Sequence, residues 1–482
     1  MLDAQRRIAE LEAERDAERA RSERLELQIG ALLEQVTALT QKVAELTERL
    51  GQNSRNSHLP PSSDPPGTAG KGGGAQRPKS NRPRGGQRGH RGTRRELAPT
   101  DKVNEFVDVY PAECENCWAA LPEQADPHAK RYQWIEVPPI QPHIKETRRH
   151  EVTCPCCGHR TRAPYDEQEI PASPFGPRLM SIVALLTGVY HVSRRNTAKL
   201  LSDLVGVPIS LGAVSAVEAR VSDAVEPAVA EAWKRVEGAP VKHTDGTTWL
   251  KAGVVLALWT IASTAATVFK IVADGSRATL APLYGALRGI LVSDRATALA
   301  FWAMERRQIC WAHLLRKYVS FSERAGPAGE IGRQLLDYTG LLFDYWHDYK
   351  AGKLDRATFL AWMVPVRAQV EAVLERAVAS RLDGLAGSCA NILEHRAALW
   401  TFVDVDGVEP TNNHAERELR AFVLWRKRCF GTQSERGNLF AERVMTVAHT
   451  ARKQRKDVLA FLTGCCQAQL DGTRAPSLFA TA

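Results

Sequence analysis

The sequence predicts a multidomain α/β protein in which a mixed β-sheet core, interrupted by a helical insertion, follows four smaller N-terminal segments. Three observations predict this organisation. A heptad repeat of apolar residues lies within the first 50 residues, two Cys-x-x-Cys pairs follow a long basic stretch, and runs of strand-like composition begin near residue 240. A chain of 482 residues with 44% hydrophobic residues has ample material for more than one core.

Residues 1–51 are predicted to form a coiled coil. Apolar residues recur at alternating spacings of four and three at Leu25, Ile29, Leu32, Val36, Leu39, Val43, Leu46 and Leu50. Such a seam is typical of helices that pair with one another. A single amphipathic helix folded onto its own protein is the alternative, but no neighbouring segment is apolar enough to cover the stripe. We therefore expect a homo-oligomer, at least a dimer.

Residues 52–100 are predicted to be a disordered basic linker, because Pro, Gly, Ser and Arg leave no material for a core. From Lys71 to Arg95 there are nine Lys or Arg and no Asp or Glu, which could account for the whole net charge of +9. Such a block favours a polyanionic partner, although a solvated tail also fits. Arginines on a Gly/Pro-rich backbone suit a narrow DNA minor groove. They are Arg82, Arg84, Arg88, Arg91, Arg94 and Arg95.

Residues 101–170 are predicted to be a zinc-ribbon-like module. Two Cys-x-x-Cys pairs can supply the four thiolates that tetrahedral Zn²⁺ requires, and strands are expected between them over 133–139 and 143–153. The expected ligands are Cys114, Cys117, Cys154 and Cys157, and Cys156 or His159 could substitute for one of them. A closed site of this kind would stabilise the module without taking part in chemistry.

Residues 171–238 are predicted to be helical, with helices over 175–191, 193–206 and from 210 onward. The Gly-containing turn between the second and third fits a helix-turn-helix, and a plain helical bundle fits about as well.

Strand-like runs define the core. Strands are expected over 241–250, 252–262, 266–274, 289–294 and 307–312, with helices over 276–287 and 297–304. The predicted core comprises 239–320 and 405–460, separated by a helical insertion at 321–404 and followed by a C-terminal tail at 461–482.

The predicted order of strands and helices brings three acidic residues together. Asp245 lies in the first core strand, Asp294 ends the fourth, and Glu416 lies on a helix after the fifth. In a sheet of RNase H-like topology the first and fourth strands are neighbours, so these carboxylates can meet at one edge. Oxygen ligands suit Mg²⁺, and two such ions can promote in-line phosphoryl transfer. Taken singly, the two aspartates could cap turns or helices, and Glu416 could pair with Arg420.

The same motifs carry a resemblance. The segments SRNSHLPPSSD, RPRGGQRGHRG, TDGTTW, SDRATA, CWAHLLRK and NNHAERELR, with the leading heptads and paired cysteines, resemble the DDE transposases of the insertion-sequence-66 family. The resemblance implies that Asp245, Asp294 and Glu416 are a catalytic triad using Mg²⁺ or Mn²⁺. It also implies cleavage at mobile-element ends, strand transfer into double-stranded target DNA, and helper proteins from the same element. Gly246 departs from the family, whose members often carry Glu there.

Other residues of these motifs have predicted roles. Asn412 and Asn413 are expected to cap the helix of Glu416, to orient it or to contact DNA, and Arg417, Arg420 and Arg426 to line the path of DNA phosphates. Glu418 is expected to face away from the acids, which would make it a control for Glu416. Trp311 is expected in the core and His313 at the surface, with base or phosphate contacts as the alternative.

The sequence therefore predicts a DNA transposase. A non-catalytic DNA-binding repressor and an RNase H-like nuclease without strand transfer are the alternatives. The first residues lack an apolar signal core and the longest apolar runs are shorter than a membrane span, so we expect no membrane association. We expect a cytoplasmic, nucleoid-associated protein of a prokaryote.

Overall fold

The computed structural model describes residues 2–50, 52, 56–57, 95–164, 171 and 173–479. They belong to two compact units. The larger unit comprises Met1–Gly72, Tyr165–Thr197 and Leu211–Ala482, and the smaller comprises Gly73–Pro164 and Ala198–Ser210. Most of the predicted linker lies outside the described residues, including Arg82, Arg84, Arg88, Arg91 and Arg94.

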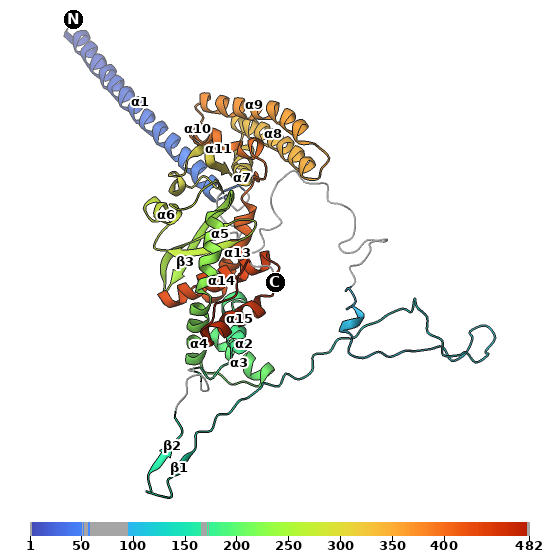
Figure 1. The fold of residues 1–482 in the computed structure, drawn as a ribbon. Helices are drawn as coiled ribbons and strands as arrows, with labels where there is room; N and C mark the ends of the chain where they lie inside the picture. Colours follow the sequence, from blue (N-terminus) through green and yellow to red (C-terminus); the bar gives the residue numbers. More distant parts are fainter. Residues whose placement is uncertain are drawn as a thin grey trace. The chain divides into compact units, whose positions relative to one another are not determined.

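A five-stranded mixed sheet forms the centre of the larger unit (Figure 1). Its strands are β3 (Val241–Lys251), β4 (Val254–Ala262), β5 (Thr267–Val272), β6 (Ile290–Ser293) and β7 (Arg307–Ile309), in the order β5-β4-β3-β6-β7. β3 pairs antiparallel with β4 and parallel with β6. The predicted adjacency of the first and fourth core strands is confirmed.

The two faces of β3 are covered by different elements. Side chains alternate along a strand, so every second residue shares a face. Thr244 contacts Tyr284 of α6 (Arg277–Tyr284), whereas the His243 ring stacks on that of His414 and the Trp249 ring contacts Phe422, both in α13 (Asn413–Cys429). Asp245 lies on the α13 face with His243 and Trp249.

Helix α14 (Glu435–Lys453) protects the free edge of the sheet. Three of its side chains, each four residues from the next, accept backbone N–H groups of alternate β5 residues. Thr450 accepts from Thr267 at 3.1 Å, Thr446 from Phe269 at 3.2 Å and Glu442 from Ile271 at 2.7 Å. Four helical residues rise about 6 Å and two strand residues rise about 6.6 Å, so the two rows stay in register. An otherwise exposed edge is thereby closed to other strands.

The expected helix over 297–304 is wrong. The segment between β6 and β7 forms two short 3₁₀ turns, Thr297–Leu299 and Met304–Arg306. The indole N–H of Trp302 donates to the carbonyl of Arg306 at 3.0 Å, which holds the chain in a tight return to β7.

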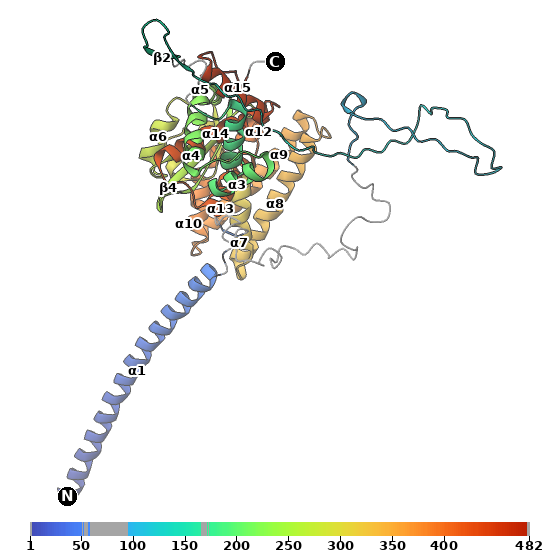
Figure 2. The same ribbon diagram turned by 90° about the horizontal axis from the view of Figure 1, so that it is seen from below.

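The helical insertion shares its core with the sheet. It contains α7 (Trp311–Ser322), α8 (Gly326–Lys350), α9 (Arg356–Ala379), α10 (Ala386–Glu394), α11 (Arg396–Leu399) and α12 (Thr401–Asp404). α8 and α9 lie side by side in both ribbon views (Figure 2). Their buried residues form one cluster with Val292 of β6 and Ile309 of β7, so the insertion packs as part of the core.

Helix α9 alone among the described helices is long and apolar enough to cross a membrane by length and composition. Its side chains Phe359, Met363, Val366, Val370, Val373, Leu374 and Ala377 are buried in the insertion core, which accounts for its apolar composition.

The helical segment before the sheet differs from expectation in one respect. It contains α2 (Pro177–Ala184) with a π-turn over Leu185–Val189, then α3 (Arg194–Val205), α4 (Leu211–Ala224) and α5 (Glu226–Glu237). The predicted third helix is thus two helices. Pro227 in the first turn of α5 lacks the N–H that a continuous helix would need, and the break falls at Val225.

The predicted C-terminal tail contains a helix, α15 (Val458–Leu470). Phe461, Leu462, Cys465 and Cys466 are buried, and α15 packs on α2 and α4. Beyond it, the Leu478 N–H donates to Glu231 of α5 at 2.8 Å. The tail assignment over 461–482 is therefore wrong, because the helices that cover the apolar face of α15 lie more than 230 residues away in the sequence.

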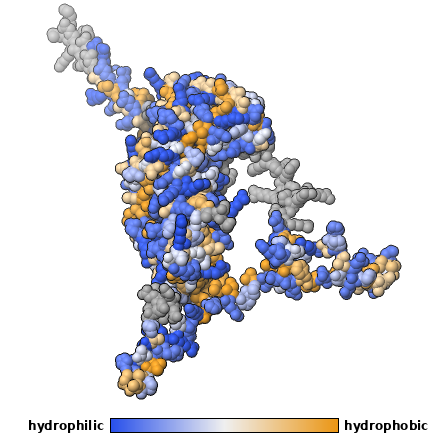
Figure 3. Space-filling model, viewed as in Figure 1, coloured by the Kyte–Doolittle hydropathy of each residue, from blue (hydrophilic) through white to orange (hydrophobic). Residues whose placement is uncertain are grey.

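Helix α1 (Leu2–Leu50) occupies the segment of the heptads. Its seam residues Leu25, Ile29, Leu32, Val36, Leu39 and Val43 are each about half exposed or more, and hydrophobic residues are visible along α1 in Figure 3. The helix is confirmed, and its pairing with a second copy stays a prediction.

Apart from the part of α3 that follows Thr197, the smaller unit contains little regular structure among its described residues. A 3₁₀ turn spans Thr100–Lys102, and β1 (Glu151–Thr153) pairs antiparallel with β2 (Arg160–Arg162). The strand expected over 133–139 is absent from this described stretch, and only Glu151–Thr153 remains of that over 143–153. Trp134, Ile135 and Ile144 are largely exposed, so no core holds these segments as strands.

Candidate active site

The three predicted acids come from three elements that meet at one edge of the sheet. Asp245 lies within β3, Asp294 directly follows β6, and Glu416 lies in the first turn of α13. β3 and β6 are adjacent parallel strands, and α13 packs across β3 and β4. All three acids are half-buried.

The other two acids are near enough to act on Asp245 electrostatically, although among the described residues the three carboxylates are not gathered within 4.8 Å of one another. Burial, followed by the negative charges of Asp294 and Glu416, raises the pKa of Asp245 to about 7. Burial disfavours the charged form of a carboxyl group, and nearby like charges disfavour it further. A nearby positive charge would oppose this shift by favouring the ionised carboxylate.

Two side chains of α7 face Glu416. His313 Nδ1 lies 3.8 Å from Glu416 Oε1, and an Arg316 guanidinium nitrogen lies 3.9 Å from Glu416 Oε2. Glu416 Oε1 is buried and accepts no hydrogen bond from the residues that the structure describes. Burial lowers the pKa of His313, while the charges of Asp294 and Glu416 oppose this shift. His313 therefore faces the acids, and Trp311 is fully buried, as expected for a core residue.

Cys310 joins His313 and Glu416 in a second grouping. One ligand atom of each lies within 4.8 Å of the others. Burial raises the pKa of the Cys310 thiol to about 11, which favours the protonated thiol. Its sulfur instead accepts the backbone N–H of Asn412 at 3.1 Å.

Asn412 joins the start of α13 to β3 through a buried hydrogen bond. It is fully buried, and its side-chain amide donates to the carbonyl of Thr244 at 2.7 Å. The N–H of Trp311 donates to the carbonyl of Pro410 at 2.9 Å, which ties the start of α7 to the same segment. Asn412 is the residue before α13, but its side chain makes no capping bond. The predictions of a side-chain cap and of DNA contact by Asn412 are therefore wrong, because this side chain bonds to β3 in the interior.

The ring of Trp259 accounts for the glycine at position 246, where the sequence departs from the family that it resembles. A Cβ atom at this position would lie 2.8 Å from Cε2 of the Trp259 ring on β4. Trp259 packs edge-on against Tyr284, with ring centroids 6.5 Å apart. A larger side chain at 246 would require the indole ring to move.

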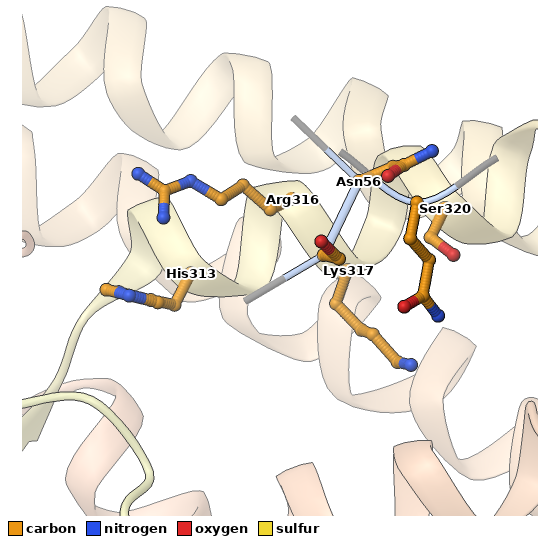
Figure 4. A pocket seen from close by; sticks show the side chains of 7 residues that line it. Asn56, His313, Arg316, Lys317 and Ser320 are labelled. Carbon is orange, nitrogen blue, oxygen red and sulfur yellow. The ribbon is translucent and has the colours of Figure 1, made fainter. Parts of the chain in front are cut away.

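A small pocket lies along α7 (Figure 4). Its volume is about 250 Å³, and His313, Arg316, Lys317 and Ser320 line it from α7. Gln52, Asn56 and Ser57 of the N-terminal segment complete its lining. The pocket is therefore basic where it adjoins Glu416.

The remaining predicted DNA contacts differ in exposure. Asn413, Arg417 and Arg420 are exposed on α13, and Arg95 is exposed in the smaller unit. Arg426 is half-buried and donates to the side chains of Thr247 and Thr248 and to the Thr248 carbonyl on β3. Arg426 therefore holds α13 to β3.

Glu418 lies in an ionic network that was not predicted from the sequence. His449 Nδ1 and Lys453 Nζ lie 2.5 Å and 3.0 Å from its carboxylate, and His414 Nε2 lies 3.5 Å away. Although burial raises the pKa of Glu418, bonds from His414 and His449 and the charge of Lys453 hold that pKa well below its usual range. Glu418 does not serve as the expected control for Glu416, because it faces α14 and its replacement would break this network. The four-residue spacing of His414 and Glu418 was the available signal.

Three residues of α14 also have structural roles. Asn438 accepts the indole N–H of Trp249 at 3.1 Å, and Glu442 caps β5. Arg443 pairs with Asp223 at 3.2 Å and with Glu226 at 2.6 Å.

The cysteine pairs form two knuckles of the same geometry. In the first, the Trp118 N–H donates to the Cys114 carbonyl and the Cys114 N–H to the Ala119 carbonyl, both at 2.9 Å. The second repeats this pattern from Cys154 to Gly158 and His159 at 2.9 Å and 2.8 Å. Backbone N–H groups of Asn116 and Cys117 lower the pKa of Cys114, and those of Cys157 and Cys156 lower the pKa of Cys154. Across the described residues, however, the thiols of the two knuckles are not gathered around one point.

Two family models match parts of the chain. The family model described as a family of unknown function, DUF6444, matches residues 4–96. No curated protein matches the chain. The model of the transposase IS66 family matches residues 172–439, more than half of the chain, and that range contains the sheet, the insertion and all three acids. The mixed five-stranded sheet of this chain is compatible with a DDE transposase core. The chain belongs to the IS66 family of transposases.

Proposed function

We propose that the protein is a DNA transposase whose catalytic triad is Asp245, Asp294 and Glu416, on an RNase H-like core. One observation carries the proposal. Three carboxylates from separate elements lie close enough for two of them to raise the pKa of the third. Repelling, half-buried acids cost stability, and such an arrangement is typical of a functional site.

The donor set fits divalent metal ions. Carboxylate oxygens are the ligands that Mg²⁺ and Mn²⁺ prefer, and Glu416 Oε1 is buried without a hydrogen-bond donor among the described residues. Asp245, Asp294 and Glu416 would hold two ions. When bound, these ions would neutralise charge on the reacting phosphate and polarise the attacking oxygen.

The chain's own residues supply position and charge. Asn412 fixes Glu416 relative to Asp245, since it bonds to the residue beside Asp245 and lies four residues before Glu416. Arg316 and Lys317 of the α7 pocket would hold the phosphate next to the reacting one. The same site would serve two steps, with water attacking at the element end and the freed 3′-hydroxyl then attacking target DNA.

The other segments would support DNA binding and pairing of ends. The equal geometry of the two knuckles supports Cys114, Cys117, Cys154 and Cys157 as the ligands of a structural Zn²⁺, with Cys156 and His159 outside the matched positions. Exposed Asn413, Arg417 and Arg420, with Arg95 and the preceding arginines, would contact phosphates. The α1 seam would pair two copies. The protein would act in the cytoplasm on nucleoid DNA, with helper proteins of the same element.

The test is a strand-transfer assay with labelled element ends and Mg²⁺ or Mn²⁺. The parent protein should join ends to target DNA, and Asp245→Ala, Asp294→Ala and Glu416→Ala should each lower the rate at least about a hundredfold while retaining DNA binding. Joining by all three variants at the parent rate would disprove the triad. Cleavage without joining would instead favour a nuclease, and DNA binding without cleavage would favour a repressor.

A further inference from the structure

A second basic pocket lies at the far end of α13 from Glu416. It has a volume of about 650 Å³ and is formed by the start of α3, the end of α13 and the loop into α14. Arg194, Arg195, Arg428 and Arg436 line it, and we call it the arginine pocket. Glu218 is the one acidic residue in its described lining, which leaves an excess of three positive charges.

The arginine pocket is held in shape by its own contacts. Arg194 donates two hydrogen bonds to Glu218 Oε2, at 2.5 Å and 2.9 Å, and Glu218 is buried. Arg436 donates to Ser215 of α4. These two arginines are therefore fixed before any ligand arrives.

The loop below the arginine pocket is anchored to the sheet. The N–H of Thr432 donates to the Leu250 carbonyl at 2.9 Å, and the Thr432 carbonyl accepts from Ala252 at 2.8 Å. Gly431 has a positive φ of 82°, and a Cβ there would lie 2.1 Å from the Leu250 oxygen. Only glycine fits this close approach, so the loop that lines one side of the pocket is held against β3.

The two remaining arginines are available to a ligand. Arg195 and Arg428 are exposed, and no hydrogen bond or ion pair to another described residue holds either guanidinium. A planar guanidinium suits bidentate contact with a phosphate. Two arginines held in place and two available arginines around one cavity favour specific binding of one phosphodiester group over non-specific attraction of DNA to the surface.

A basic stripe joins the arginine pocket to the acids. The exposed positions of α13 after Glu416 are Arg417, Arg420, Leu424, Lys427 and Arg428, and none is acidic. Glu416 and Arg428 are twelve residues apart, so about 18 Å of helix separates them. This length corresponds to about five base pairs of duplex DNA.

We propose that the arginine pocket binds a backbone phosphate of duplex DNA about five base pairs from the reacting phosphate. The choice of DNA as the source of the phosphate rests on the proposed function. The pocket would fix the register of the duplex along α13, and it contributes no group to the chemistry.

The experiment uses the full-length protein and a fluorescein-labelled DNA duplex at several salt concentrations. Arg195→Ala/Arg428→Ala should weaken binding about tenfold or more and reduce the salt dependence of log Kd by about two. Arg474→Ala is the control, because Arg474 is exposed and does not line the pocket. Gln433→Glu, which adds a negative charge to the lining without removing an arginine, should also weaken binding. Melting temperatures equal to the parent's would show that these variants fold.

Two outcomes would overturn the arginine pocket. One is duplex binding by both pocket variants with the affinity and salt dependence of Arg474→Ala. The other is stronger competition for the pocket by single-stranded RNA than by duplex DNA. If the parent cleaves no DNA but the double variant still weakens duplex binding, the proposed function fails and the pocket stands. If the parent cleaves DNA and the double variant binds normally, the pocket alone fails.

Discussion

The side-chain amide of Asn412 donates a hydrogen bond to the carbonyl of Thr244 at 2.7 Å, across 168 residues of sequence. Thr244 precedes Asp245, and Asn412 lies one helical turn before Glu416. The bond therefore fixes two of the three acids relative to each other.

Asn412→Ala should lower both stability and cleavage. Loss of this bond leaves a buried carbonyl without its donor, at a cost of about 1–3 kcal/mol in the free energy of unfolding. The DNA cleavage rate should fall about tenfold or more, because small displacements of catalytic groups are costly. Denaturant unfolding and single-turnover cleavage measure the two effects. Asn413→Ala, at the exposed neighbouring position, should leave the stability near that of the parent. Weaker DNA binding by Asn412→Ala with an unchanged cleavage rate would show that Asn412 does not position the catalytic acids.

Asp245 should make stability depend on pH. Its pKa in the folded protein is about 7, above the ordinary value of 3.8. The folded state thus holds a proton that the unfolded state releases in this range, so the stabilising contribution is full below about pH 4 and is lost as pH rises through about 7. With metal ions chelated, the parent should lose more melting temperature between about pH 5 and pH 8 than Asp245→Asn does, by roughly 3 °C or more.

Metal ions should reverse that dependence. Mg²⁺ competes with the proton for Asp245, so it should raise the melting temperature of the parent more at about pH 8 than at about pH 5. Asp245→Asn is the control and should respond little at either pH. An equal response of parent and variant would place the metal elsewhere.

Glu418→Gln should destabilise the fold strongly. The change leaves Lys453 and His449 beside a neutral amide in a largely buried site. Removing one member of a buried ionic network costs about 3–5 kcal/mol. The measurement is the free energy of unfolding from denaturant titration near neutral pH. Glu435→Gln removes a solvent-exposed ion pair with Lys251 and should destabilise the fold far less than Glu418→Gln. Equal losses in the two variants would contradict the importance of the buried network.

The sequence predicted those features that depend on local pattern. The strands of the sheet follow from β-branched runs between turns, and the order of these strands then places Asp245 beside Asp294. Asn412 and Glu418 were misread because their partners, Thr244 and His449, lie on other elements and no local periodicity reveals them. The helix α15 was missed for the same reason, since its apolar face is covered by α2 and α4.

Zinc content should distinguish the cysteines. The purified protein should contain about one zinc per chain, and Cys114→Ser or Cys157→Ser should abolish it, because a closed site requires four ligands. Cys156→Ser should retain the metal, since Cys157 and not Cys156 matches Cys117 in the knuckle geometry. Amide exchange over 103–162 should slow when zinc is present. Zinc loss in Cys156→Ser with retention in Cys157→Ser would reverse the assignment of these two thiols.

The exposed seam of α1 should control oligomeric state. Leu32 and Leu39 are on the heptad seam and are 59% and 63% exposed, which is costly for a helix that stays alone in water. A second copy would cover both positions with its own seam. Leu32→Asp/Leu39→Asp places charges in that interface, so light scattering after size exclusion should show a shift from dimer to monomer. Leu33 is equally exposed at 62% but lies off the seam, so Leu33→Asp should remain dimeric. A dimer that survives the seam change would assign association to another surface, whereas dissociation by both changes would show that α1 associates without a defined seam.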